Sequence, residues 1–275
     1  MNRIPEIFDH PTVDLERIES ISRIPEPRSR YIIAITPRSG SSYLCDAMTR
    51  TRRFGNPSEV LNQQFIEEIM KKVPGRNADE YLRNLMRARK SANGVAGLKA
   101  SWFQFRNFHQ ALDDDGYLFD FRYIYLTRRD LAAQAVSLYK ATETDIFHTN
   151  VKPSESAMER LQALEYDYEK IEEWYEHILR QERGWWYFFY RNRIVPLHIT
   201  YEEIDEDLMA VLRRIATFVD VDPGNVVLPE GPSAFQKVRD YRNIEWAFRF
   251  SMERAGRREG FRSEDTLSPH LSPTQ

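Results

Sequence analysis

The chain has 275 residues and a formal net charge of −3, with 41% hydrophobic and 29% charged side chains. This composition excludes an intrinsically disordered protein. It also argues against a general binder of nucleic acids, which needs a clear excess of basic residues to displace counterions. Any site for an anion must therefore be local.

The number of cysteines and the length of the apolar segments indicate the cellular compartment of the protein. Cys45 is the only cysteine, which excludes an internal disulfide framework and a multi-cysteine zinc site, and no metal is expected. A small core residue is a more frequent role for it than a reactive thiol. The N-terminus lacks the apolar core of a secretory signal, and no run has the length of a membrane span. We expect a cytoplasmic protein.

Short apolar runs alternate with helical patterns along the chain and predict an α/β fold with a P-loop-like open parallel sheet flanked by helices. A polar, proline-containing extension is expected at 1–28, the domain at 29–260, and a flexible Ser/Pro-rich tail at 261–275. The predicted strands are 31–36, 94–99, 121–127 and 194–200. The predicted helices are 41–51, 60–72, 78–91, 130–143, 155–191 in one or two pieces, and 203–219.

Two later segments carry opposite charge. Residues 155–182 contain nine acids against three bases, most simply a solvated helix face, although a role in selecting partners stays open. Residues 236–262 contain eight bases against four acids. This basic segment is either a solvated helix or a cover over a bound polyphosphate.

The first strand leads into the turn PRSGSS, residues 37–42, and then into a helix. Such a turn gathers backbone N–H groups at the positive end of the helix dipole, which favours an anion. Gly40 permits close approach of the backbone, the serines add hydroxyl donors, and Arg38 adds a charged, bidentate donor. The turn predicts a phosphate cradle, with a tight turn lacking a ligand as the alternative.

This turn differs from the loop of nucleotide triphosphatases, because no Lys-Ser/Thr pair follows the glycine. A second element strengthens the case for an anion. The third strand ends in Arg128, and Asp130 is a plausible N-cap of a helix that carries Ser137 on the same face as Gln134. Arg128 and Ser137 are expected to reach one phosphate at the carboxyl ends of the strands.

Together these elements resemble the sulfotransferases that use 3′-phosphoadenosine 5′-phosphosulfate (PAPS), and in particular the bacterial trehalose 2-sulfotransferase family. The resemblance covers about 31–250 and implies the sulfotransferase fold. It lies in PRSGSSYLCDAMTRTRRFGNPSEVLN, in GLKASWFQF, in RRDLAAQAVSLYKATETDIFH, and in KVRDYRNIEW. Lys237 stands where the family pattern has arginine, which keeps the charge but loses the bidentate fork.

The resemblance implies transfer of a sulfuryl group from PAPS to a carbohydrate or glycolipid hydroxyl by in-line displacement. By this resemblance Glu59 is the general base, and Arg128 and Ser137 hold the 3′-phosphate, with Lys237 and Arg242 completing that clamp. The donor cradle is the run Arg38, Ser39, Gly40, Ser41, Ser42 and Tyr43. Charge on the leaving phosphate would be met by Arg38 and the loop amides.

From the residues alone, Glu59 is more simply a first-turn glutamate that stabilises a helix beginning near Val60. Lys99 either assists the reaction or closes a strand end with a surface charge. Trp102, Gln134 and His148 are candidates for acceptor contacts, although packing roles are common for such residues.

Two other functions stay open. A nucleotide-dependent kinase would use the same cradle for ATP and would require magnesium. A non-catalytic protein of this fold would bind a nucleotide or glycolipid without transfer. The partners expected are the small-molecule donor and a carbohydrate acceptor, with no nucleic acid, and a homodimer is possible.

Overall fold

The computed structural model describes residues 2–9, 13–147, 152–231, 233, 235 and 241–264. It divides into two compact units. The sheet unit holds the described residues within 1–129 and 177–235, and the helical unit holds those within 130–147, 152–176 and 241–264. This division runs through the predicted 29–260 domain, whose boundaries stay a prediction.

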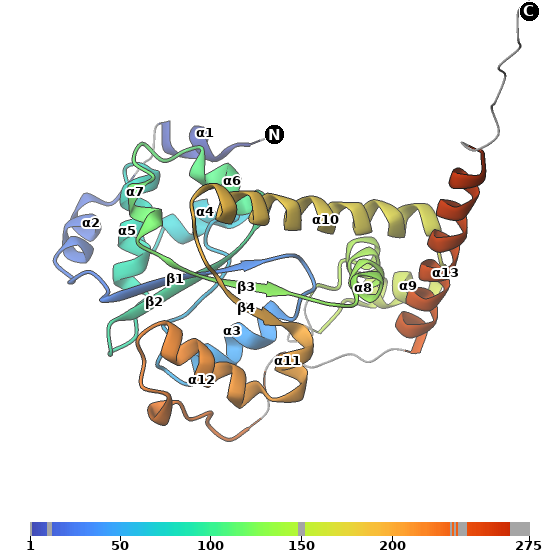
Figure 1. The fold of residues 1–275 in the computed structure, drawn as a ribbon. Helices are drawn as coiled ribbons and strands as arrows, with labels where there is room; N and C mark the ends of the chain where they lie inside the picture. Colours follow the sequence, from blue (N-terminus) through green and yellow to red (C-terminus); the bar gives the residue numbers. More distant parts are fainter. Residues whose placement is uncertain are drawn as a thin grey trace, which may run out of the picture. The chain divides into compact units, whose positions relative to one another are not determined.

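The sheet unit is built on four parallel strands in the order β2-β1-β3-β4 (Figure 1). The strands are β1 Ser29–Ile35, β2 Val95–Ser101, β3 Arg122–Thr127 and β4 Leu197–Thr200. All four lie where the apolar runs predict them, and the parallel arrangement is confirmed. The fourth strand begins later than predicted, after Pro196, which has no N–H for a sheet ladder.

Helices cover both faces of this sheet. Side chains alternate along β1, so that Ile32 and Ala34 enter one core while Tyr31, Ile33 and Ile35 enter the other. The helices assigned to the sheet unit are α1 Ile4–Asp9, α2 Leu15–Ser22, α3 Ser41–Arg50, α4 Gln63–Met70, α5 Ala78–Ala88, α6 Trp102–His109, α7 Gly116–Phe119, α11 Tyr201–Glu206 and α12 Leu208–Phe218. A short 3-10 helix spans Pro223–Asn225.

Several elements differ from their sequence-based predictions. The predicted extension at 1–28 contains α1 and α2, whose Ile4 and Ile21 are buried in a core of the sheet unit. The helix predicted at 203–219 is split at Asp207, because that side chain caps α12 by accepting a hydrogen bond from Ala210 N–H. Two further helices, α6 and α7, were not predicted, and α13 lies in the basic segment for which a helix was one of the two alternatives.

The helical unit contains α8 Leu131–Thr144, α9 Glu155–Ala163, the first part of α10 Tyr168–Arg191, and α13 Tyr241–Glu264. The rest of α10 belongs to the sheet unit. Asp130 caps α8 as predicted, since its side chain accepts a hydrogen bond from Ala133 N–H at 2.8 Å. Trp246 of α13 is buried against Tyr139 and Tyr166.

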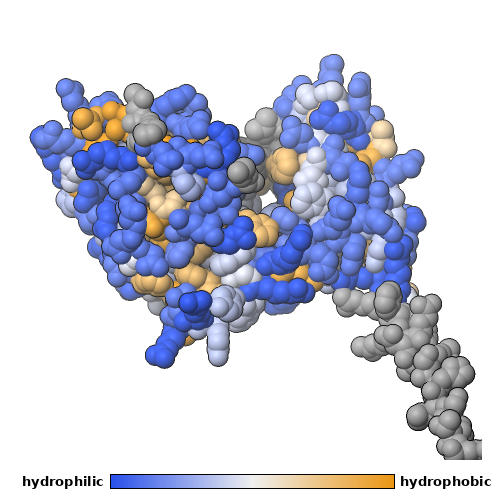
Figure 2. Space-filling view, turned by 90° about the horizontal axis from the view of Figure 1, so that it is seen from above, coloured by the Kyte–Doolittle hydropathy of each residue, from blue (hydrophilic) through white to orange (hydrophobic). Residues whose placement is uncertain are grey.

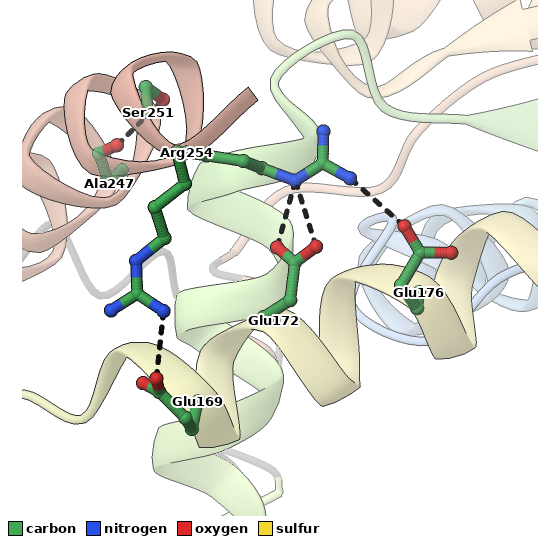
Figure 3. Close-up of polar contacts among 7 residues, drawn as sticks. Glu169, Glu172, Glu176, Ala247, Ser251 and Arg254 are labelled. Carbon is green, nitrogen blue, oxygen red and sulfur yellow. Dashed lines mark hydrogen bonds and ion pairs between the residues drawn. The ribbon is translucent and has the colours of Figure 1, made fainter. Parts of the chain in front are cut away.

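The acidic and basic segments pair with one another inside the helical unit (Figure 3). Arg254 of α13 donates to Glu172 at 2.8 Å and to Glu176 at 2.9 Å, with only 11% of its side chain exposed. Arg257 lies 2.8 Å from Glu169. The predicted solvated acidic face is therefore wrong for Glu172 and Glu176, which pair with the buried Arg254, whereas Glu169 is exposed as predicted.

The surface is mainly hydrophilic on the face drawn in Figure 2. Within the described residues, no helix combines the length and apolar character needed to cross a membrane.

Candidate active site

The PRSGSS turn connects β1 to α3 at the carboxyl end of the sheet. Gly40 is the N-cap of α3 and has a left-handed backbone with φ of 81°. A Cβ on Gly40 would lie 2.5 Å from Tyr201 Cδ2, so both the backbone angle and the Tyr201 ring require glycine here. Because no side chain caps α3, its first-turn amides are oriented for a ligand.

The turn brings two arginines close together. Burial lowers the pKa of the Arg38 guanidinium, and the nearby positive charge of Arg128 lowers it further. Arg128 follows the end of β3, and its guanidinium carbon lies 4.8 Å from the centroid of the Tyr201 ring. Two neighbouring cations of this kind repel each other, and an anion between them would relieve the repulsion.

Two polar atoms at this turn have no hydrogen-bond partner within the described part of the chain. They are Ser39 Oγ and Arg128 Nε, and both are buried. Such atoms are costly unless a ligand or water satisfies them. The remaining cradle residues lie on α3: Ser41 is buried, while Ser42 and Tyr43 are half-buried.

Glu59 lies in an ion pair beside this turn. Lys99 of β2 is only 6% exposed, and its Nζ lies 3.1 Å from Glu59 Oε1 and 3.1 Å from Ser42 Oγ. The predicted strand-end surface charge is therefore wrong for Lys99. One buried ammonium connects the first turn of α3 to the candidate base.

The segment that carries Glu59 is fixed by several backbone contacts. Lys99 N–H donates to Ser58 O at 3.1 Å, and Arg89 donates to Ser58 Oγ at 2.7 Å. Tyr81 Oη donates to Val60 O at 2.8 Å. Helix α4 begins only at Gln63, so the alternative role of Glu59 in a first helical turn is wrong.

Sequence reasoning missed two residues of this site, Gln104 and Tyr201. Gln104 of α6 donates from Nε2 to Glu59 Oε2 at 2.9 Å. Tyr201 begins α11 and packs on both Gly40 and Arg128. Each residue belongs to a capping-box pattern, SWFQ at 101–104 or TYEE at 200–203, which gives a helix start but not a partner.

Trp102 lies in an aromatic cluster of the sheet unit. Its ring centroid is 5.4 Å from that of Trp185, and a Cβ on Gly184 would lie 2.3 Å from the Trp102 ring. Trp102 is half-buried, so a role in acceptor binding stays a prediction. Trp185 is fully buried and donates to Ile35 O at 3.0 Å, which gives it a packing role.

Three of the predicted site residues lie in the helical unit. Gln134 is fully buried, Ser137 is half-buried, and both belong to α8. Arg242 of α13 donates to Leu161 O at 3.3 Å and stacks on Trp246, with 4.9 Å between guanidinium carbon and ring centroid. His148 and Lys237 lie outside the described residues. The ligand contacts of all five stay predictions.

The described residues contain no cluster of three or more His, Cys, Asp or Glu side chains suited to a metal ion.

Comparison with known families adds a second line of support. The family model described as Stf0 sulphotransferase matches residues 30–253. The chain belongs to this family. The match includes the PRSGSS turn, Glu59, Lys99 and Arg128, and with the parallel sheet it confirms the predicted fold class.

Two curated relatives are similar to most of this chain. Trehalose 2-sulfotransferase of Mycobacterium tuberculosis is 23% identical, covering 81% of this chain and 94% of the relative. Trehalose 2-sulfotransferase of Mycolicibacterium smegmatis is also 23% identical, covering 84% and 96%. Membership of the family and these relatives support a sulfotransferase enzyme.

Two solved structures were also found. A sulfotransferase from Alicyclobacillus acidocaldarius superposes with a TM-score of 0.44 at 15% identity, covering 79% of this chain and 89% of that one. Retinol dehydratase, in a complex with retinol and PAP, gives a TM-score of 0.41 at 14% identity, covering 94% and 87%.

Proposed function

We propose that this protein transfers the sulfuryl group of PAPS to a hydroxyl of a carbohydrate or glycolipid, with Glu59 as the general base. The observation that carries the proposal is the position of Lys99 Nζ, 3.1 Å from both Ser42 Oγ and Glu59 Oε1. It connects a carboxylate to an anion-binding turn through a single buried cation.

The turn fits a phosphosulfate. The amides at the start of α3, the hydroxyls of Ser39 and Ser42, and the charge of Arg38 are the donors expected for such a group. Arg128 supplies charge for the 3′-phosphate. The unpartnered Ser39 Oγ and Arg128 Nε support this assignment, since a bound anion would satisfy both.

The proposed reaction is a single displacement. The acceptor oxygen forms a bond to sulfur while the bond between sulfur and the bridging phosphate oxygen breaks. Glu59 takes the proton of the attacking hydroxyl, which is a contribution of typically 10²- to 10⁴-fold. The negative charge left on adenosine 3′,5′-bisphosphate is met by Arg38, Lys99 and the α3 amides, which are oriented before the reaction begins.

A carbohydrate acceptor is proposed from the names of the two mycobacterial relatives. Trp102 is a candidate for a sugar-stacking side chain, because its ring is half-buried. Gln134 and His148 remain candidates for further acceptor contacts. Ser137, Lys237 and Arg242 remain candidates for the 3′-phosphate, and a homodimer in the cytoplasm stays possible.

The experiment is an assay with PAPS and a panel of sugars that includes trehalose, followed by mass spectrometry of the products. Release of adenosine 3′,5′-bisphosphate together with a sulfated sugar supports the proposal. Binding of the bisphosphate without any product would favour a non-catalytic protein. Transfer from ATP that depends on magnesium would favour a kinase.

A further inference from the structure

The side chain of Gln104 joins the backbone of α6 to the carboxylate of Glu59. Its Oε1 accepts a hydrogen bond from Ser101 N–H at 3.0 Å, and its Nε2 donates to Glu59 Oε2 at 2.9 Å. Both ends of the amide are therefore engaged. Only the first of these bonds is needed for the capping box at the start of α6.

The two partners fix which way the amide faces. Ser101 N–H is a donor, so it requires the carbonyl oxygen of Gln104, and the Glu59 carboxylate is an acceptor, so it requires the NH₂ group. If the amide were rotated by half a turn, its NH₂ group would face the Ser101 N–H donor, and its carbonyl oxygen would face the Glu59 carboxylate. The start of α6 thus presents an N–H donor toward Glu59 in one orientation.

Glu59 is held through both carboxylate oxygens. Oε1 lies 3.1 Å from Lys99 Nζ, and Oε2 accepts the bond from Gln104. The side chain of Glu59 is 28% exposed, which leaves it accessible from solvent.

We propose that Gln104 is a positioning residue that sets the orientation of the Glu59 carboxylate for proton transfer. This inference rests on the proposed role of Glu59 as the base. The hydrogen bond from Gln104 to Oε2 restrains the rotation of this carboxylate about its terminal bond. Because a small misplacement of a reacting group is costly, loss of the Gln104 bond is expected to lower kcat about tenfold to a hundredfold.

The test uses two variants of Gln104. Gln104→Met keeps the length of the side chain and removes both hydrogen bonds, so kcat is expected to fall about tenfold to a hundredfold. The affinity for adenosine 3′,5′-bisphosphate should stay within about twofold, because Gln104 contacts no residue of the PRSGSS turn among its described contacts. Gln110→Met, at an exposed position at the end of α6, is the matched control.

Gln104→Glu separates positioning from a purely structural role. The introduced carboxyl faces Glu59, and it donates to Glu59 only when protonated. Its activity relative to the original chain should therefore rise about fivefold or more between pH 8 and pH 6. A residue that only caps α6 would give a ratio that does not change with pH.

Full turnover of Gln104→Met, or a constant ratio for Gln104→Glu, would overturn the inference. A loss of kcat in Gln110→Met equal to that in Gln104→Met would do the same. The Glu59→Gln variant distinguishes failure of the proposed base from failure of the positioning role of Gln104. If Glu59→Gln is inactive while Gln104→Met is fully active, only the role of Gln104 fails, and if Glu59→Gln is fully active, the proposed base fails.

Discussion

The PRSGSS turn and the Glu59 cluster are both polar parts of the sheet unit, but their internal bonding differs. At the turn, Ser39 Oγ and Arg128 Nε have no hydrogen-bond partner among the described residues. Burial lowers the pKa of Arg38, and the charge of Arg128 lowers it further. In the Glu59 cluster, both carboxylate oxygens have partners, from Lys99 and Gln104.

The PRSGSS turn and the Glu59 cluster therefore acquire their geometry in different ways. The turn gathers hydrogen-bond donors and positive charge, and we propose that an anionic ligand satisfies them. The Glu59 cluster is complete within the protein, so its carboxylate is oriented before any substrate arrives. Binding of the sulfuryl donor and proton transfer to Glu59 are therefore expected to respond to different substitutions.

Lys99→Met should have a large effect, because Lys99 contacts both Ser42 of the turn and Glu59. Loss of one preorganised donor to the developing charge is expected to lower kcat about 10²- to 10³-fold. Steady-state kinetics with PAPS and the best sugar acceptor measures it, with thermal unfolding to show that the variant is folded. Lys72→Met, at an exposed position, is the control. Equal kcat values for the two variants would contradict the assignment of Lys99.

Arg128→Gln should weaken the binding of adenosine 3′,5′-bisphosphate at the PRSGSS turn without affecting the Glu59 cluster. Charge-assisted hydrogen bonds contribute about 1.5–3 kcal/mol, so the Kd for adenosine 3′,5′-bisphosphate is expected to rise about tenfold to a hundredfold. Isothermal titration calorimetry measures this affinity directly. The exposed Arg213 of α12 offers the control Arg213→Gln. An unchanged affinity in Arg128→Gln would remove Arg128 from the donor site.

Gly40→Ala should disturb the turn less. A left-handed residue other than glycine costs about 1–2 kcal/mol, and the new Cβ would also meet Tyr201. We expect a bisphosphate affinity several-fold weaker and a Tm lower by a few degrees. Gly256→Ala in α13 is the matched control, since its Cβ would meet no described atom within 4 Å. A Gly40→Ala variant with unchanged affinity and Tm would show that the turn tolerates a side chain.

Substitution of Cys45 should have the smallest effect on kcat, although this residue lies on α3 only a few residues after the turn. Burial raises the pKa of its thiol to about 11, so only about a thousandth of it is thiolate at pH 8. The native protein should not react with a thiol reagent, and Cys45→Ala should retain kcat. Rapid labelling that abolishes activity would contradict the predicted core role of Cys45.

Much of the sheet and the turn could be predicted because their signals are local. The buried strands are continuous apolar runs, and the glycine turn lies directly between β1 and α3 in the chain. The capping of α8 by Asp130 was predictable for the same reason.

The rest of the site depends on distant contacts. Gln104 and Glu59 are forty-five residues apart, and nothing in either local pattern indicates that they meet. Tyr201 lies far from both Gly40 and Arg128 in the chain. The acidic face of α10 was misread at Glu172 and Glu176 for a similar reason, because Arg254 reaches them from α13. Spacing predicts which residues share a helix face, but not which element covers that face.

The most direct test of the central claim compares Glu59→Gln with the original chain in two measurements on the same preparation. We predict that kcat of Glu59→Gln for sugar sulfation falls about 10²- to 10⁴-fold, while its affinity for adenosine 3′,5′-bisphosphate stays within about twofold. Glu67→Gln, at an exposed position of α4, should match the original chain in both. Full turnover by Glu59→Gln, or a parallel loss of bisphosphate affinity, would contradict the division into a donor-binding turn and a prearranged base.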